Sequence, residues 1–168
     1  MAEITLADIR AADDLVRQVA RRTPLLPAHW MEPLVGGPIH LKAENLQRSG
    51  SFKLRGAYVR LARLSAAERA KGVVAASAGN HAQGVAVAAS DLGIQSTVFM
   101  PRTASLPKVM ATRAYGARVE LTGETIEDAL QAAAEFVART GAVMIHPFDH
   151  QDIIAGQGSV GLEIVEQL

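Results

Sequence analysis

The sequence has 168 residues, which is enough for about one domain with a substantial core. Its 17 Lys and Arg balance 17 Asp and Glu, so charge gives no reason to expect nucleic acid or an anionic membrane as a partner. The absence of cysteine excludes disulfides, thiolate metal sites and cysteine nucleophiles. Charges interrupt the first residues, unlike in a signal peptide, and no uncharged run is long enough to cross a bilayer. We therefore expect a cytoplasmic protein.

The first third of the chain predicts two helices separated by a loop and a short strand. Thr5 and Asp8 form a helix-capping pattern, and Pro24 ends that helix. The prolines and glycines that follow indicate a loop. The predicted elements are a helix over 5–22, a strand over 39–42 and a helix over 51–64 with Ser51 as its cap.

Beyond residue 71, short apolar runs alternate with longer amphipathic segments, several of which end in glycine. The predicted strands are 73–76, 97–100, 117–121 and 142–145, and the predicted helices are 81–92, 107–115 and 125–139. Such alternation implies right-handed crossovers and a parallel sheet with helices on both faces, a three-layer α/β fold. A last helical pattern over 159–168 stops without an end signal, so we expect the chain to be a fragment.

Several motif matches fail on their context. Gly156–Gly161 has the glycine spacing of a dinucleotide-binding turn, but a poor strand precedes it and no acidic residue follows at the required distance, which favours close packing at a helix start. Gly79–Gly84 has the glycine spacing of a phosphate-binding loop without its Lys and Ser/Thr. Ser105–Lys108 lacks the companion motifs of its hydrolase family. His146 and His150 are better explained as polar loop residues than as zinc ligands.

Lys53 is the first residue for which the sequence indicates a chemical role. It lies in the first turn of a predicted helix, where the dipole disfavours positive charge and lowers the pKa of an ammonium group. A lysine that must react as a neutral amine benefits from such a place. The small residues over 49–51 allow the backbone to approach a ligand, and Phe52 is placed to lie against a planar ring.

The segment 75–84 is the second candidate, because it follows a predicted parallel strand and opens a helix. Ligands of α/β sheets bind at this edge, and the exposed N–H groups of a helix start suit a carboxylate. The alternative is an ordinary turn that needs only Gly79 and Asn80 for its backbone angles. From this segment alone, both interpretations stay open.

Together these segments resemble the fold-type II family of pyridoxal-phosphate enzymes, and within it most closely the threonine dehydratases. The resemblance depends on GSFKLRG at 50–56 and SAGNH at 77–81. The segments KAENLQ at 42–47, HPFD at 146–149 and AGQG at 155–158 are also similar to that subgroup. Five separate motifs in the right order cover nearly the whole chain.

The resemblance implies pyridoxal 5'-phosphate as cofactor and no metal. Lys53 would hold the cofactor as a Schiff base, Phe52 would pack near the pyridine ring, and Asn80 would hydrogen-bond the phenolic oxygen. The residues implied around the substrate carboxylate are Ser77, Ala78, Gly79, Asn80 and His81.

The implied reaction converts L-threonine, and also L-serine, to a 2-oxo acid and ammonia, with Lys53 as the base at Cα. The implied setting is amino-acid metabolism such as isoleucine biosynthesis, in a homo-oligomer acting on a small amino acid. Serine racemase is a rival, but the family's racemases carry a serine where this chain has Ala78. Threonine synthase fits the motifs less well. The alternative from another functional class is a fragment that catalyses nothing and binds a partner subunit.

The resemblance also implies a division into domains. Residues 53–147 would form a small α/β domain, inserted between residues 1–52 and 148–168 of a larger cofactor domain. The phosphate-binding loop and the partner of the pyridine nitrogen would lie beyond Leu168. We therefore expect these 168 residues to be inactive on their own.

Overall fold

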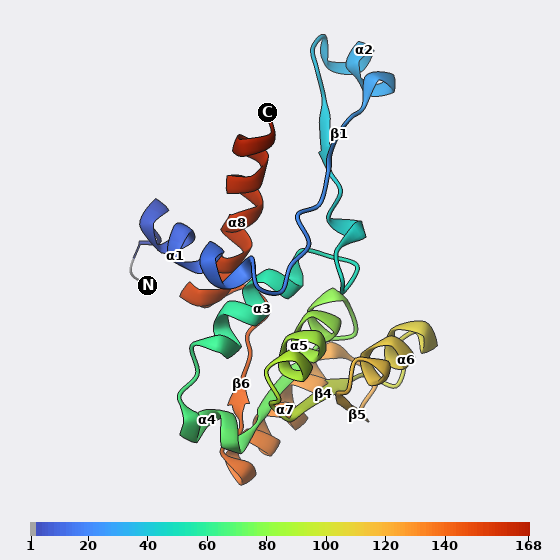
Figure 1. Ribbon diagram of the computed structural model, residues 1–168. Helices are drawn as coiled ribbons and strands as arrows, with labels where there is room; N and C mark the ends of the chain where they lie inside the picture. Colours follow the sequence, from blue (N-terminus) through green and yellow to red (C-terminus); the bar gives the residue numbers. More distant parts are fainter. Residues whose placement is uncertain (1–2) are drawn as a thin grey trace.

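The computed structural model describes residues 3–168, in which helices surround a parallel sheet and a narrow hairpin projects from one end (Figure 1). No helix in this described part combines the length and the apolar character needed to cross a membrane. The helices are α1 (Leu6–Val16), α2 (Glu32–Val35), α3 (Lys53–Ala62), α4 (Ala66–Lys71), α5 (Asn80–Asp91), α6 (Leu106–Ala114), α7 (Ile126–Thr140) and α8 (Gln151–Gln167). The strands are β1 (Leu25–Pro27), β2 (His40–Lys42), β3 (Val73–Ala76), β4 (Ser96–Met100), β5 (Arg118–Leu121) and β6 (Val143–Met144).

The main sheet has the strand order β5-β4-β3-β6, and all its pairs are parallel. Its two faces are covered by different helices, because successive side chains of a strand point to opposite sides. Val98 and Met100 of β4 pack on residues of α5 and α6. Val74 of β3 and Phe99 of β4 pack on alanines of α7. The predicted α/β fold with a parallel sheet covered on both faces is confirmed.

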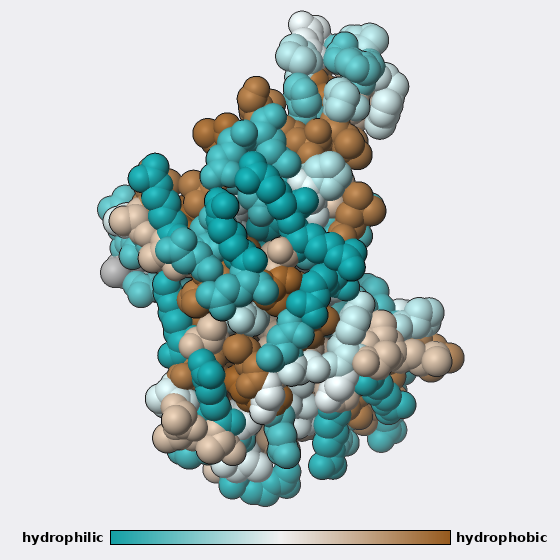
Figure 2. Space-filling view, in the orientation of Figure 1, coloured by the Kyte–Doolittle hydropathy of each residue, from teal (hydrophilic) through white to brown (hydrophobic). Residues whose placement is uncertain are grey.

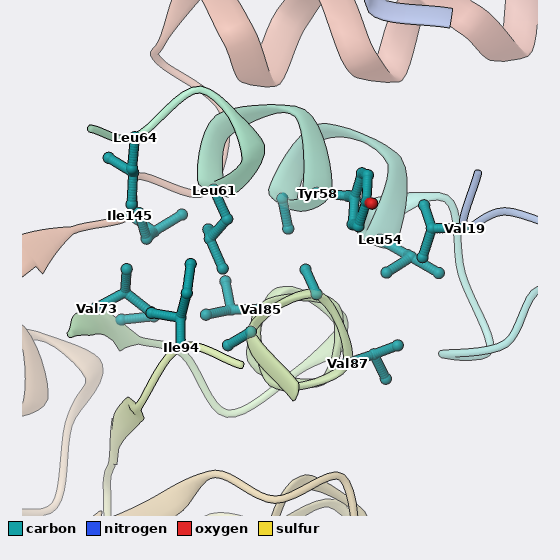
Figure 3. Close-up of a cluster of buried hydrophobic side chains, with 14 of the residues drawn as sticks. Val19, Leu54, Tyr58, Leu61, Leu64, Val73, Val85, Val87, Ile94 and Ile145 are labelled. Carbon is teal, nitrogen blue, oxygen red and sulfur yellow. The ribbon is translucent and has the colours of Figure 1, made fainter. Parts of the chain in front are cut away.

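The largest cluster of buried apolar side chains lies between α3 and α5 and extends to β3 and the end of β6 (Figure 3). Leu54 and Leu61 of α3 meet Val85 of α5, and all three are fully buried. Alanines and valines supply most of the rest, so the helices approach closely. This contact fixes the start of α3 relative to the start of α5.

Two predicted boundaries near the N-terminus are wrong. The first helix ends at Val16 instead of continuing to residue 22, because the chain turns so that Val19 joins the core beside Leu54. The helix predicted from Ser51 begins at Lys53, and its N-cap residue is Phe52, which makes no side-chain capping bond, although the Oγ atom of Ser51 accepts the backbone N–H of Lys53. The capping pair of Thr5 and Asp8 is confirmed, since each side chain bonds the other residue's backbone N–H.

The last helix is much longer than predicted. α8 begins at Gln151 rather than near residue 159, and the Nδ1 atom of His150 accepts the backbone N–H of Asp152 at its start. Gly156 and Gly158 therefore lie inside a helix with no strand before them. Close packing, not a dinucleotide turn, accounts for this motif.

The hairpin of β1 and β2 was not predicted in full, because the sequence indicates only the second strand. Its two strands pair antiparallel, and the short helix α2 lies at the tip (Figure 1). Trp30 and Leu34 near this tip are 74% and 76% exposed. Figure 2 shows hydrophobic residues where the hairpin lies beside the end of α8. The hairpin thus carries apolar surface away from the core.

The division into a small and a large domain stays a prediction. Its proposed boundary falls at Lys53, the first residue of α3. α3 packs against α5 on one side and against α8 on the other. This helix therefore joins the two proposed parts.

Candidate active site

Lys53 begins α3, and its amine reaches the segment between β6 and α8. The backbone N–H of Lys53 donates to the Oγ atom of Ser51 at 3.4 Å. Its Nζ atom donates to the carbonyl oxygen of Pro147 at 2.9 Å and lies 5.3 Å from the centre of the Phe52 ring. Burial lowers the pKa of Lys53 below its ordinary value. The expected direction of the pKa shift is present, with burial rather than the helix dipole as its cause.

The segment 77–79 connects β3 to α5 at the carboxyl edge of the sheet. The backbone N–H of Gly79 donates to the Oγ atom of Ser77 at 3.2 Å. α5 then begins at the exposed Asn80, and no acidic residue stands in its first turn. The first N–H groups of a helix lack partners within it and carry partial positive charge. This helix start is therefore suited to an anionic group.

His81, the second residue of α5, is buried, with 4% of its surface exposed. Its Nε2–H donates to the carbonyl oxygen of Ile145 at 2.9 Å. Burial lowers its pKa to about 4, so the imidazole is neutral near pH 7. The side chain of His81 is therefore held at the end of β6. The group of His81 that is available to a ligand at the start of α5 is its backbone N–H.

Gly84 brings these two segments together. It stands one turn into α5 and faces the first turn of α3. A Cβ atom at Gly84 would lie 2.9 Å from the carbonyl carbon of Lys53 and 3.0 Å from the backbone nitrogen of Leu54. Only a glycine allows the backbones to approach this closely. Sequence reasoning missed this role, because the close approach is a tertiary contact.

Gly56 and Gly156 have the same role between α3 and α8. A Cβ atom at Gly156 would lie 2.8 Å from the carbonyl oxygen of Arg55. One at Gly56 would lie 2.7 Å from the carbonyl oxygen of Ile153. The helix that begins with Lys53 is therefore held tightly on both sides.

A buried network of charges anchors the same helix to the hairpin and to α8. Arg55 is fully buried and binds both carboxylate oxygens of Glu44, at 2.9 and 2.8 Å. Its Nη1 atom also donates to Glu163 at 2.7 Å, and Lys42 donates to the other oxygen of Glu163 at 2.5 Å. Burial acts to lower the pKa of Arg55, but the two carboxylates raise it overall. Both arginine and lysine are thus paired in a region that excludes water.

The segment 146–149 is ordered by one imidazole. The Nδ1 atom of His146 accepts the backbone N–H of Asp149 at 2.7 Å and that of Phe148 at 3.3 Å. The sequence pointed to this segment only by resemblance and assigned it no contact with Lys53. Because His146 and His150 each bond the backbone locally, their four-residue spacing has a structural explanation.

The described residues fit one side of a pyridoxal phosphate site. A partly buried amine with a lowered pKa is suited to bond an aldehyde carbon. The ring of Phe52, which is 38% exposed, lies beside that amine. The first turns of α5 pack against the start of α3, where Gly84 meets the backbone of Lys53. The three predicted features, Lys53, Phe52 and the segment 77–81, therefore belong to one region of the fold.

The comparisons with known proteins identify the family of the chain. Residues 16–168 match the family model described as "Pyridoxal-phosphate dependent enzyme". An L-threonine ammonia-lyase of Thermotoga maritima is 52% identical over 165 residues, which are 98% of this chain and 41% of that protein. A catabolic L-threonine dehydratase of Staphylococcus aureus is 42% identical, with 98% of this chain and 48% of that protein covered. The chain thus spans less than half the length of these relatives.

Solved structures also match nearly the whole chain. The processed threonine deaminase isoform 2 of Solanum lycopersicum has a TM-score of 0.91 and 44% identity, over 97% of this chain and 44% of that one. A maize serine racemase has a TM-score of 0.95 and 35% identity, over 99% of this chain and 51% of that one. On the family match and the shared fold, the chain belongs to the pyridoxal-phosphate-dependent enzyme family.

Proposed function

We propose that the protein carrying this chain is a pyridoxal-phosphate-dependent lyase that converts L-threonine, and also L-serine, to a 2-oxo acid and ammonia. The observation that carries the proposal is the partly buried amine of Lys53, whose backbone packs against α5 at Gly84 and whose charge acts on His81 in the first turn of α5. The similarity to threonine ammonia-lyases supports the choice of substrate and reaction. The similarity covers under half of those proteins, so the proposal concerns the part of the site that these residues supply.

Lys53 would hold the cofactor through Nζ and later act as the base that takes the proton from Cα. Its lowered pKa favours the neutral amine that both roles need. Bound pyridoxal phosphate supplies the conjugated ring that accepts the negative charge developing at Cα. The backbone N–H groups at the start of α5 would bind the substrate carboxylate and fix the direction of the Cα–H bond.

Asn80 and Phe52 would orient the cofactor. Asn80 is exposed at the first position of α5, where its amide is free to donate to the phenolic oxygen. Phe52 would pack against the ring from the side of Lys53. These two roles come from the resemblance of the motifs, and the positions of both residues next to the amine and the helix start support them.

Serine racemase is the second candidate, because two serine racemases are among the similar solved structures. Racemisation needs a proton donor on the face of Cα opposite Lys53. Ala78 occupies the position of the serine that supplies it in the resembling racemases, and a methyl group carries no exchangeable proton. Elimination of the β-hydroxyl as water, followed by hydrolytic release of ammonia, is therefore the preferred reaction.

The test is to locate the lysine that binds the cofactor. Pyridoxal phosphate is added, the product is reduced with borohydride, and the labelled peptide is identified by mass spectrometry. We expect the label on Lys53, and Lys53→Ala should lose both the label and 2-oxobutanoate formation from L-threonine, by several factors of ten in rate. Lys71→Ala is the matched control, because Lys71 is an exposed lysine of α4 outside the site. A label on another lysine would refute the assignment.

A further inference from the structure

We propose that His146 is a positioning residue for Lys53, and that it acts through the peptide bond between Pro147 and Phe148. No contact joins the imidazole to the amine directly. Instead, the imidazole and the amine bind opposite ends of the same peptide group. The consequence for catalysis rests on the function proposed above, whereas the effect on the amine itself does not.

One end of this peptide is held by His146. The N–H of Phe148 donates to the Nδ1 atom of His146 at 3.3 Å, and the N–H of Asp149 donates to the same atom at 2.7 Å. An imidazole nitrogen accepts only when it carries no proton, so the ring has its hydrogen on Nε2. The ring also meets the Phe148 ring edge to face, with 4.6 Å between their centres. His146 therefore fixes the orientation of the turn.

The other end of the peptide is directed at Lys53. The carbonyl of Pro147 belongs to the same plane as the N–H of Phe148, and this peptide is trans. In a trans peptide the C=O and N–H bonds point in opposite directions. When His146 draws the N–H to its own side, the carbonyl oxygen must face the other way. There it accepts a hydrogen from the Nζ atom of Lys53 at 2.9 Å.

The contact with the Pro147 oxygen fixes the direction of the Lys53 amine, which must face the atom with which it reacts. A lysine side chain has several freely rotating bonds, and fixing it costs conformational entropy. A neutral amine that gives one N–H to the Pro147 oxygen must direct its lone pair away from that oxygen. His146 thus determines, through one rigid plane, where the reactive lone pair of Lys53 points.

The variants separate the acceptor atom from the rest of the ring. His146→Asn keeps an acceptor, because the amide oxygen of asparagine takes about the place of Nδ1. His146→Ala removes it. His150→Ala is the matched control, because His150 also accepts a backbone N–H through Nδ1 but bonds Asp152 at the start of α8, not the Pro147 peptide. Circular dichroism and thermal unfolding report whether each variant is folded.

Two measurements read the effect on Lys53. The first is the pKa of the Lys53 amine. It is obtained from the pH dependence of labelling with pyridoxal phosphate, in which the product is trapped with borohydride and the labelled Lys53 peptide is quantified. The measurement is made above pH 8, where imidazoles are neutral. Without the Pro147 carbonyl the ammonium loses an acceptor, so His146→Ala should lower this pKa by about one pH unit. The second is turnover of L-threonine, where kcat should fall about three- to tenfold with little change in KM.

His146→Asn should restore both values to within about twofold of the unchanged protein, and His150→Ala should leave the Lys53 pKa unchanged. The proposal is overturned if folded His146→Ala shows the unchanged pKa at Lys53, or if His146→Asn behaves like His146→Ala. If the pKa moves as expected but no variant, nor the unchanged protein, acts on L-threonine, the proposed function fails and the positioning role stands.

Discussion

Gly84 of α5 lies against the backbone of Lys53 so closely that a Cβ atom there would be 2.9 Å from the lysine's carbonyl carbon. The atoms it would meet are backbone atoms of α3, which cannot rotate away. Any larger residue at this position must push the start of α3 from the start of α5. The distance between the amine and the helix start that faces it thus depends on a residue with no side chain.

Gly84→Ala should therefore damage the protein, although alanine favours helices. We expect a loss of about 1–3 kcal/mol in the free energy of unfolding, with a larger loss in cofactor labelling at Lys53 than overall stability explains. Gly161→Ala is the matched control, because Gly161 also lies in a helix and a Cβ there meets nothing within 4 Å. That change should stabilise by up to about 1 kcal/mol. Denaturant unfolding of both variants checks this, and equal behaviour would contradict the packing argument.

The buried charges around Arg55 yield a second prediction. Glu163 accepts from both Arg55 and Lys42, so Glu163→Ala takes away the carboxylate that pairs with Lys42 and leaves Arg55 only Glu44, in a region that excludes water. We expect a cost of about 3–5 kcal/mol in the free energy of unfolding. Glu166→Ala, in the same helix, removes only exposed ion pairs with Arg17 and Arg22 and should cost at most about 1 kcal/mol. A small effect at Glu163, measured by denaturant titration, would show that the network is dispensable.

His81 makes the stability depend on pH. Its pKa is lowered from an ordinary 6.5 to about 4 by burial, so between these values the unfolded chain binds a proton that the folded chain does not. The contribution of neutral His81 is complete above pH 6.5 and is lost as pH falls towards 4. The loss amounts to about 3 kcal/mol over that range.

His81→Gln tests this, because its amide nitrogen keeps a donor for the Ile145 carbonyl and does not titrate. Its free energy of unfolding should fall less between pH 7 and 4 than that of the unchanged protein. His29→Gln is the matched substitution at an exposed site near the hairpin tip. Parallel profiles for the unchanged protein and His81→Gln would contradict the argument.

The sequence predicts the sheet and its helices well because local patterns determine them. Apolar runs such as Val73–Ala76 are buried on both faces, and their bounds agree with the structure. α4 was missed although Ser65 and Glu68 form a capping pair that sequence inspection detects. The sequence pattern predicts the start of α8 too late in the chain, because its glycines indicate close packing at a helix start, whereas in the structure they lie inside the helix.

The site is predicted less completely than the fold. Motifs indicate Lys53 and the segment 77–81 as candidates, but they do not indicate the residues that contact them. The Pro147 oxygen is a backbone atom, which every residue type offers equally, so no residue type signals its contact with Lys53. Arg55 gives no sign of burial either, since arginine is mostly exposed in proteins and its two carboxylate partners are far apart in the sequence. Such features follow from tertiary packing.

Ala78 bears on the choice between elimination and racemisation. If a missing hydroxyl is what excludes racemisation, Ala78→Ser should raise D-serine formation from L-serine relative to 2-oxo acid formation by about a hundredfold, the lower end of the range for a positioned proton donor. Chiral analysis of recovered serine, with the 2-oxo acid measured in the same sample, gives the ratio. Ala104→Ser is the control, because it adds a hydroxyl to the loop before α6, outside the segment 77–81. Strong D-serine formation by the unchanged protein, or no change in Ala78→Ser, would mean that another group protonates the second face of Cα.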